Sequence, residues 1–344
     1  MNILNNNWLA QYCVDILGNG LELSVIGLAF LFILKGTRVF NVAFGAIFIL
    51  SGYIYSLFYL NLHLQFYGAA TLSIILVVIL IIGIDYFFKW IGGSSEIFAS
   101  PRTFVASFGI AIIIENICSR LFGNNAIIVA DQPNRVGLEI HPIIVSIIYL
   151  LFFLVVIFYF KNFLLNHKWI STPLIFFSLL IIVISIKSPA IVPYMRIKII
   201  SIALICLLLA AIFFQTRLGK NMRLFMHSPY DAKLIGYPTE YYRLACVTIA
   251  GLLIGTQSIL HIQDVAVRPD ESFRFLVAGA FVAMLFRRIS IMQLIISGII
   301  FSTVSYLTVI LFSSAWTDTL SYAMFFFLLL RRNPNITETS DGEI

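Results

Sequence analysis

Long runs of hydrophobic residues, separated by short polar stretches, extend along the sequence from residue 14 to residue 330. A helix needs about 20 mostly apolar residues to cross a bilayer, and in lipid it satisfies its own backbone hydrogen bonds. The stretch 275–286 is too short to span alone, so we expect a broken or re-entrant helix there. The pattern predicts eleven segments, at residues 14–34, 39–60, 68–88, 104–122, 143–160, 173–187, 197–215, 244–262, 275–286, 290–312 and 317–330.

The composition excludes a soluble protein. Sixty per cent of the 344 residues are hydrophobic and 11% are charged, whereas soluble domains are about a quarter charged. The predicted fold class is therefore an all-α, polytopic transmembrane helical bundle of about 9–11 membrane segments, surrounded by the lipid bilayer. The net charge of +6 does not indicate a nucleic-acid partner, because the basic residues lie in short loops between apolar segments.

The charged loops predict the orientation of the chain in the membrane. Alternate loops hold 15 of the 22 Lys and Arg residues. By the positive-inside rule these loops face the cytoplasm, which places the N-terminus outside and the C-terminus inside. We expect a multi-pass protein of the bacterial inner (plasma) membrane. The basic residues of these loops are Lys35, Arg38, Lys89, Arg102, Lys161, Lys168, Arg217, Lys220, Arg223, Lys233, Arg243, Arg287, Arg288, Arg331 and Arg332.

One hydrophilic stretch, residues 215–243, carries clear signals of local structure. Ser228 can cap a helix that has Pro229 at its first position and Asp231 completing a pattern like a capping box. Gly236 suits the left-handed exit from a helix, and Pro238 prevents its continuation. The signals predict a helix of about seven residues, roughly 10 Å long. On these signals alone, a rigid cytoplasmic unit and an ordinary ordered loop are both open.

The same stretch resembles the cytoplasmic coupling loop of the branched-chain amino acid ABC transporter permease family. In that family a T-R-L-G-K/R-x-x-R run precedes a short Ala-containing helix that ends in Gly. Residues 35–53 resemble the family's early V-x-N-F-A-H-G segment, and residues 103–123 resemble its fourth helix. The resemblance covers about 80% of the chain. The matching residues of the loop are Thr216, Arg217, Leu218, Gly219, Lys220, Arg223, Ala232 and Gly236.

The chain departs from the family pattern at several positions. Phe44 stands where the early motif has His, and LFRRISIMQ at residues 285–293 replaces a Gly-rich turn between two late helices. Residues 124–190 have no counterpart that can be placed, and we expect them to add two helices within 143–187. These departures leave the cargo open, together with the effect of Phe44 and of residues 285–293 on transport.

The resemblance implies the permease subunit of an ABC importer, which is a transport subunit and not an enzyme. The implied partners are cytoplasmic P-loop ATPase subunits, a second permease subunit in a homodimer or heterodimer, and an extracytoplasmic solute-binding protein. The implied cargo is a small polar solute, such as a branched-chain amino acid or a similar amino acid or amide. No cofactor is expected in this chain, since ATP would be bound by the partner ATPase. The residues implied in coupling to the ATPase are Arg217, Gly219, Lys220, Arg223, Ser228, Asp231, Ala232 and Gly236.

Polar residues inside the apolar segments are candidates for the translocation pathway. Charges within a membrane are costly, so they usually face a cavity or a partner. Glu115 and Asn116 lie in the segment 104–122, where the alternative is a polar clamp between helices. Asn41 precedes Ala43 and Gly45, where a break in the helix could expose backbone groups to a ligand. The alternative for Asn41 is a position at the start of a helix.

We expect a single transmembrane permease domain over residues 1–332, including the coupling loop at 216–243, followed by a disordered polar cytoplasmic tail at 333–344. Gly251 and Gly255 form a G-x-x-x-G spacing, which permits close helix contact within the subunit or with a partner.

Signals of other functions are missing from the sequence. There is no G-x-x-x-x-G-K-S/T phosphate loop, so the chain is not expected to hydrolyse ATP. No His, Cys, Asp and Glu cluster has metal spacing, so no metal site is expected. The alternative function is an ion-coupled secondary transporter, for which Glu115 is the acidic candidate. A membrane enzyme acting on lipids is disfavoured because the histidines are dispersed.

Overall fold

The computed structural model describes residues 7–92, 101–129, 137–140, 190–285 and 290–331. The predicted segments at 143–160 and 173–187 lie outside these residues, as do the tail and much of the predicted departure at 285–293. The domain division therefore stays a prediction.

The described chain is almost entirely helical, which confirms the predicted all-α bundle. Seven helices of the described part are long and apolar enough to cross a membrane. The helices are α1 (Asn7–Thr37), α2 (Ala43–Ser56) with the π-helical η1 (Leu57–Asn61), α3 (Phe66–Gly92), α4 (Pro101–Phe122), α7 (Tyr194–Gln215), α8 (Arg217–His227), α9 (Pro229–Leu234), α10 (Thr239–Asp264), η2 (Pro269–Glu271), α11 (Ser272–Met284), α12 (Ile291–Leu311), η3 (Ser314–Trp316) and α13 (Thr317–Arg331). Two short strands, β1 (Gly137–Ile140) and β2 (Ala190–Pro193), pair antiparallel with Gly137 opposite Pro193. Helix α11 has 13 residues, fewer than a span needs, in line with the short helix expected there.

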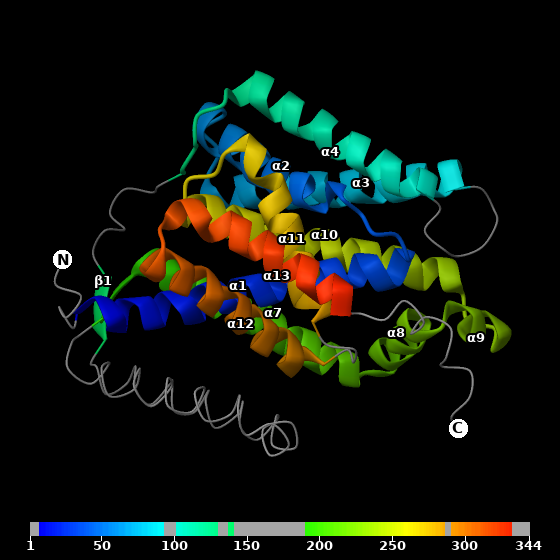
Figure 1. The fold of residues 1–344 in the computed structure, drawn as a ribbon. Helices are drawn as coiled ribbons and strands as arrows, with labels where there is room; N and C mark the ends of the chain where they lie inside the picture. The colour runs from blue at the N-terminus through cyan, green and yellow to red at the C-terminus, as the bar shows by residue number, and fades with distance from the viewer. Residues whose placement is uncertain (1–6, 93–100, 130–136, 141–189, 286–289, 332–344) are drawn as a thin grey trace, which may run out of the picture.

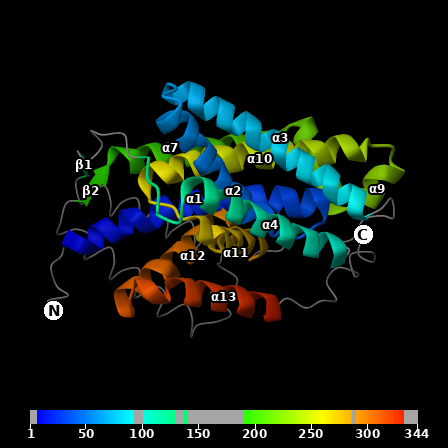
Figure 2. The same cartoon turned by 90° about the horizontal axis from the view of Figure 1, so that it is seen from above.

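Helix α1 is the central helix of the bundle. It packs against α10, α11 and α12, and α7 lies alongside it (Figures 1 and 2). In the most apolar stretch of 18 residues in α1, 78% of the residues are buried. The corresponding share is 22% in each of α3, α4 and α7. A helix that is apolar all round and buried belongs to the interior, whereas α3, α4 and α7 turn apolar faces outward, as helices in contact with lipid do.

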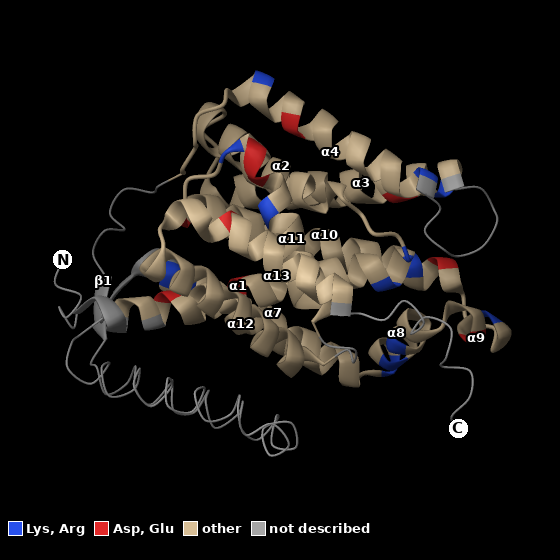
Figure 3. Ribbon diagram, in the orientation of Figure 1, with Lys and Arg blue, Asp and Glu red and all other residues tan. Residues whose placement is uncertain are grey.

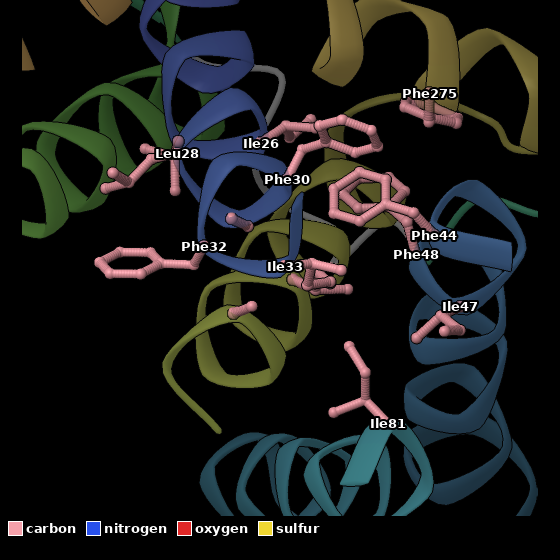
Figure 4. Close-up of a cluster of buried hydrophobic side chains, with 14 of the residues drawn as sticks. Ile26, Leu28, Phe30, Phe32, Ile33, Phe44, Ile47, Phe48, Ile81 and Phe275 are labelled. Carbon is pink, nitrogen blue, oxygen red and sulfur yellow. The ribbon is translucent and has the colours of Figure 1, made fainter. Parts of the chain in front are cut away.

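Aromatic rings fill the space between α1, α2 and α11 (Figure 4). The ring of Phe30 meets that of Phe44 edge to face at 5.1 Å, and Phe48 stacks on Phe275 at 4.5 Å. Phe44 is fully buried. The residue at the position of the family's His therefore belongs to the aromatic core of this chain.

The two ends of the bundle differ in charge. Most described Lys and Arg residues gather at the end where α8 and α9 lie, which we call the α8–α9 end (Figure 3). There, Lys89 of α3 pairs with Glu240 of α10 at 2.8 Å, and Asp85 pairs with Arg243 at 2.7 Å. The clustering of basic residues predicted from the loops is thus present along one end of the folded chain.

Replacing Phe30 with Ala should destabilise the bundle, because a fully buried ring leaves a cavity between α1 and α2. The expected loss is on the order of 3 kcal/mol, measured as a lower thermal unfolding midpoint in detergent. Phe327→Ala is the matched control, since that side chain is 67% exposed on α13. Equal midpoints for the two variants would contradict the assignment of Phe30 to the core.

Candidate functional site

Helix α8 forms because Thr216 caps it and one of its faces is apolar. The Thr216 side chain accepts a hydrogen bond from the Gly219 backbone N–H at 3.1 Å. The polar residues Arg217 and Lys220 are exposed. This helix was not predicted, although the sequence contains two signals for it, a capping Thr and apolar residues at helical spacing. The buried residues of that face are Gly219, Met222, Phe225 and Met226.

A sharp corner joins α7 to α8. A Cβ atom at Gly219 would lie 1.9 Å from the backbone oxygen of Phe213, so no side chain fits there. Arg223 extends back over the corner, with its guanidinium carbon 5.0 Å from the centre of the Phe214 ring, as in a cation–π contact. Gly219 and Arg223, both predicted to act in coupling, therefore fix the angle between α7 and α8.

Helix α9 is the short helix predicted from its capping signals. Ser228 accepts a hydrogen bond from the Asp231 N–H at 3.3 Å, and Pro229 begins the helix. Gly236 has φ of +87°, and Tyr237 N–H bonds to the carbonyl of Ala232 at 2.9 Å. This left-handed exit ends the helix after six residues.

The α8–α9 unit, residues 216–237, is anchored at its base and exposed at its tip. Ala232 is buried, and Tyr237 and Tyr242 each hydrogen-bond to Asn221 at 3.4 Å. The tip of the unit carries exposed apolar side chains, and an apolar surface at a polar end of a protein indicates contact with another protein. Its exposed apolar side chains are Leu218, Leu224, Tyr230, Leu234 and Ile235.

The start of α2 is held against α4 and α11. The Asn41 side chain accepts a hydrogen bond from the Ala43 N–H at 3.0 Å, and Val42 N–H donates to the Ser107 hydroxyl at 3.1 Å. A Cβ atom at Gly45 would lie 1.9 Å from the Ser272 backbone oxygen. The predicted group Asn41, Ala43 and Gly45 thus forms a buried helix start in close contact with α11.

Glu115 reaches the same place from α4. Its carboxylate accepts a hydrogen bond from the Ser272 hydroxyl at the beginning of α11. Asn116 points elsewhere: its amide donates to the Ile112 carbonyl of its own helix at 2.8 Å, and the residue is exposed. The structure therefore brings Gly45 and Glu115 together at Ser272 and separates Asn116 from them.

The glycines of the G-x-x-x-G pattern lie between α10 and α3. A Cβ atom at Gly251 would be 2.9 Å from the Ile81 side chain, and one at Gly255 would be 3.1 Å from Ile74. The close helix contact that these two glycines permit is therefore made within the subunit, by α3 packing against α10.

A partly buried polar cluster near the opposite end of the bundle was not predicted. On α1 and α10 its residues recur at spacings of four and three, which places each set on one helix face. This spacing was visible in the sequence, but the two sets are more than 200 residues apart and no single motif joins them. The cluster consists of Asp15, Asn19 and Glu22 on α1, Gln257, His261 and Asp264 on α10, Arg196 on α7 and Tyr306 on α12.

Arg196 is the centre of this cluster. It pairs with Asp264 at 2.9 Å and donates to the Asn19 side chain at 2.5 Å. A second pair, Glu22 and His261, has its oxygen and nitrogen 2.5 Å apart. These charge pairs and hydrogen bonds join α1, α7 and α10. In the described part of the chain no three His, Cys, Asp or Glu side chains are arranged to hold a metal ion.

The bundle and its apolar surface define a multi-pass membrane protein. The sequence model of the family described as the permease component of the branched-chain amino acid transport system matches residues 12–329. The chain belongs to this family, as its resemblance predicted, and is a transport permease.

A solved structure that matches the chain is PsaBC from Streptococcus pneumoniae in complex with Fab. It is 14% identical with a TM-score of 0.45, covering 95% of this chain and 92% of that one. No curated protein matches the chain.

Replacing Arg196 with Met should destabilise the protein, because the Asp264 side chain, which is only 12% exposed, loses its cationic partner. Breaking a buried pair on one side costs roughly 3–5 kcal/mol, so the thermal midpoint in detergent should fall by several degrees or more. Lys198→Met, at an exposed position two residues away on α7, is the control and should leave the midpoint unchanged. An Arg196→Met protein as stable as the control would show that the cluster is dispensable for stability.

Proposed function

We propose that the chain is the permease subunit of an ABC importer, which carries a small polar solute across the bacterial inner membrane with the energy of ATP hydrolysed by separate subunits. The cargo class is a branched-chain amino acid or a similar amino acid or amide. Membership in the permease family supports this function at the level of transport. The observation that carries the rest is the α8–α9 unit, a rigid helical projection at the basic end with an exposed apolar tip.

The α8–α9 unit has the properties of a docking site for an ATPase. Leu234 and Ile235 are 69% and 65% exposed, and Arg217 and Lys220 lie on the same projection. The positive-inside rule places this end in the cytoplasm, with the N-terminus outside and the C-terminus inside. ATP binding would close the ATPase subunits, displace the unit and tilt the helices around the cargo.

The remaining partners follow from the same function. A second permease subunit, identical or different, would complete the pathway, and an external solute-binding protein would deliver the cargo. In this assembly the chain itself is not an enzyme and holds no cofactor, because ATP is bound by the ATPase. Glu115 and the start of α2 are the pathway residues we propose, with Ser272 as their meeting point.

A second candidate is an ion-coupled secondary transporter, which the buried cluster favours. Glu22, His261 and Asp264 are ionisable residues inside the bundle, as proton- and ion-coupled transporters often have. Such a transporter would need no ATPase, so the two candidates differ in their partners.

Leu234→Asp should prevent docking without disturbing the fold, because the side chain is exposed at the tip of α9. The tagged protein, purified from its native membrane in mild detergent, should carry a stoichiometric P-loop ATPase detected by mass spectrometry. The variant should carry about tenfold less, since a hot-spot side chain at an interface contributes about 1.4 kcal/mol or more. Deleting residues 228–236 should abolish both ATPase capture and uptake while the protein still inserts.

The control is Arg102→Ala, an exposed residue at the same end outside the α8–α9 unit, which should retain the ATPase. A wild-type preparation without any ATPase would overturn the importer and favour the ion-coupled transporter. Glu22→Gln would then be the variant to test for loss of uptake.

A further inference from the structure

Arg38 lies in the turn between α1 and α2 and has an unusual backbone conformation. Its φ is +58°, in the left-handed region that favours glycine. A residue with a Cβ atom is held there at an energetic cost, and such positions occur where the surrounding structure fixes them. The contacts of the Arg38 side chain show which part of the structure fixes this conformation.

The guanidinium of Arg38 binds the end of α8. Its Nη2 donates to the carbonyl oxygen of His227 at 2.7 Å and to that of Met226 at 3.1 Å. The last carbonyls of a helix have no partner within the helix and carry partial negative charge, so a cation suits this position. The side chain of Arg38 is partly buried, and this burial lowers the pKa of its guanidinium from the ordinary value.

The rest of the turn contacts α1, α2, α4 and α11. The ring of Phe40 lies 5.4 Å from that of Phe30 and 6.4 Å from that of Phe104. Val42 N–H bonds to Ser107 of α4 at 3.1 Å, and Gly45 abuts the backbone of Ser272. One short segment therefore touches the α8–α9 unit at its beginning and the proposed pathway residues at its end.

Apart from the apolar packing of α8, the other connections of the α8–α9 unit lead to elements other than α2. Asn221 donates to the Tyr242 hydroxyl at 3.4 Å, which connects the unit to α10 and not to α2, whereas its 3.4 Å bond with Tyr237 lies within the unit. The covalent connection to α7 passes through the corner at Gly219. The Thr216 hydroxyl donates to the Phe213 carbonyl at 2.6 Å, a bond that belongs to the same corner with α7. The described hydrogen bonds between the unit and the turn before α2 come from Arg38, and the bond to His227 at 2.7 Å is the shorter of them.

We propose that Arg38 is a positioning residue that transmits displacement of the α8–α9 unit to the start of α2, and through it to Ser107 of α4 and Ser272 of α11. The proposal rests on the proposed function, because it needs an ATPase that moves the unit. Arg38 then acts as a tether: when the end of α8 moves, the turn and the first residues of α2 follow.

Hydrogen–deuterium exchange tests this tether without knowledge of the cargo. The complex with its co-purified ATPase is compared with and without trapping by ATP and vanadate. In the wild type, trapping should change exchange in peptides from the α8–α9 unit and also from residues 41–56 and 272–284. In Arg38→Gly the change in exchange should persist in the α8–α9 unit. In residues 41–56 and 272–284 it should shrink about tenfold, the factor expected when a typical coupling free energy between two sites is lost.

Arg38→Gly is suited to this test because glycine favours the φ of position 38, so the fold and ATPase capture should be retained. Arg38→Lys keeps a cation near the carbonyls and should restore part of the response, whereas Arg102→Ala should behave as the wild type. A merely structural role for Arg38 would lower the thermal midpoint and ATPase capture together.

Three outcomes would overturn the tether. The first is an Arg38→Gly variant in which trapping changes exchange in all three regions as much as it does in the wild type. The second is a wild type in which exchange changes only in the α8–α9 unit. The third is an Arg38→Lys variant whose response is as weak as that of Arg38→Gly. A wild type without any ATPase, or without a response in the α8–α9 unit, would instead refute the proposed function itself.

Discussion

The structure depends on one constraint: inside a membrane, every backbone N–H and C=O must find its partner within the protein. Helices meet this constraint locally, and the breaks between them meet it through tertiary bonds. Where the chain leaves α4, Ile127 and Val267 exchange backbone hydrogen bonds at 3.0 and 2.9 Å, and the Tyr53 hydroxyl donates to the Val267 carbonyl. The break before α2 is closed by Ser107. The non-helical segments are therefore fixed points of the bundle, and candidate functional residues gather beside them.

Polar side chains follow a related rule. Arg196 and Glu22 are buried at the expense of their hydration, Asp264 is partly buried, and the partners of all three come from different helices. Such pairs hold α1, α7 and α10 in one register, because a shift of one helix would separate charges in a medium of low dielectric constant. The bundle thus combines a polar clamp near one end with an aromatic core in the middle.

The sequence predicted most spans because runs of about 20 apolar residues are a direct consequence of the bilayer. It predicted α9 because Ser228, Pro229 and Gly236 are local signals, read without knowledge of the rest of the chain. It did not predict α8, because this amphipathic helix lies in the hydrophilic stretch 215–243 and lacks the long apolar run by which the membrane helices are recognised.

Contacts between distant segments were beyond local patterns. The meeting of Glu115 with Ser272, and of Arg196 with Asp264, depends on how whole helices pack. Asn116 differs from Glu115 by one position, which rotates it to another face of α4, and only the packing of α4 shows which face is covered.

Helix α7 has a mechanical consequence of its own. It is a single helix from Tyr194 to Gln215, about 33 Å long, with the charge pairs of Arg196 at one end and the corner at Gly219 beyond the other. Because the corner admits no side chain, α8 cannot swing freely relative to α7. A force on α8 therefore acts on α7 as on a rigid lever, and any tilt about its middle carries its two ends in opposite directions.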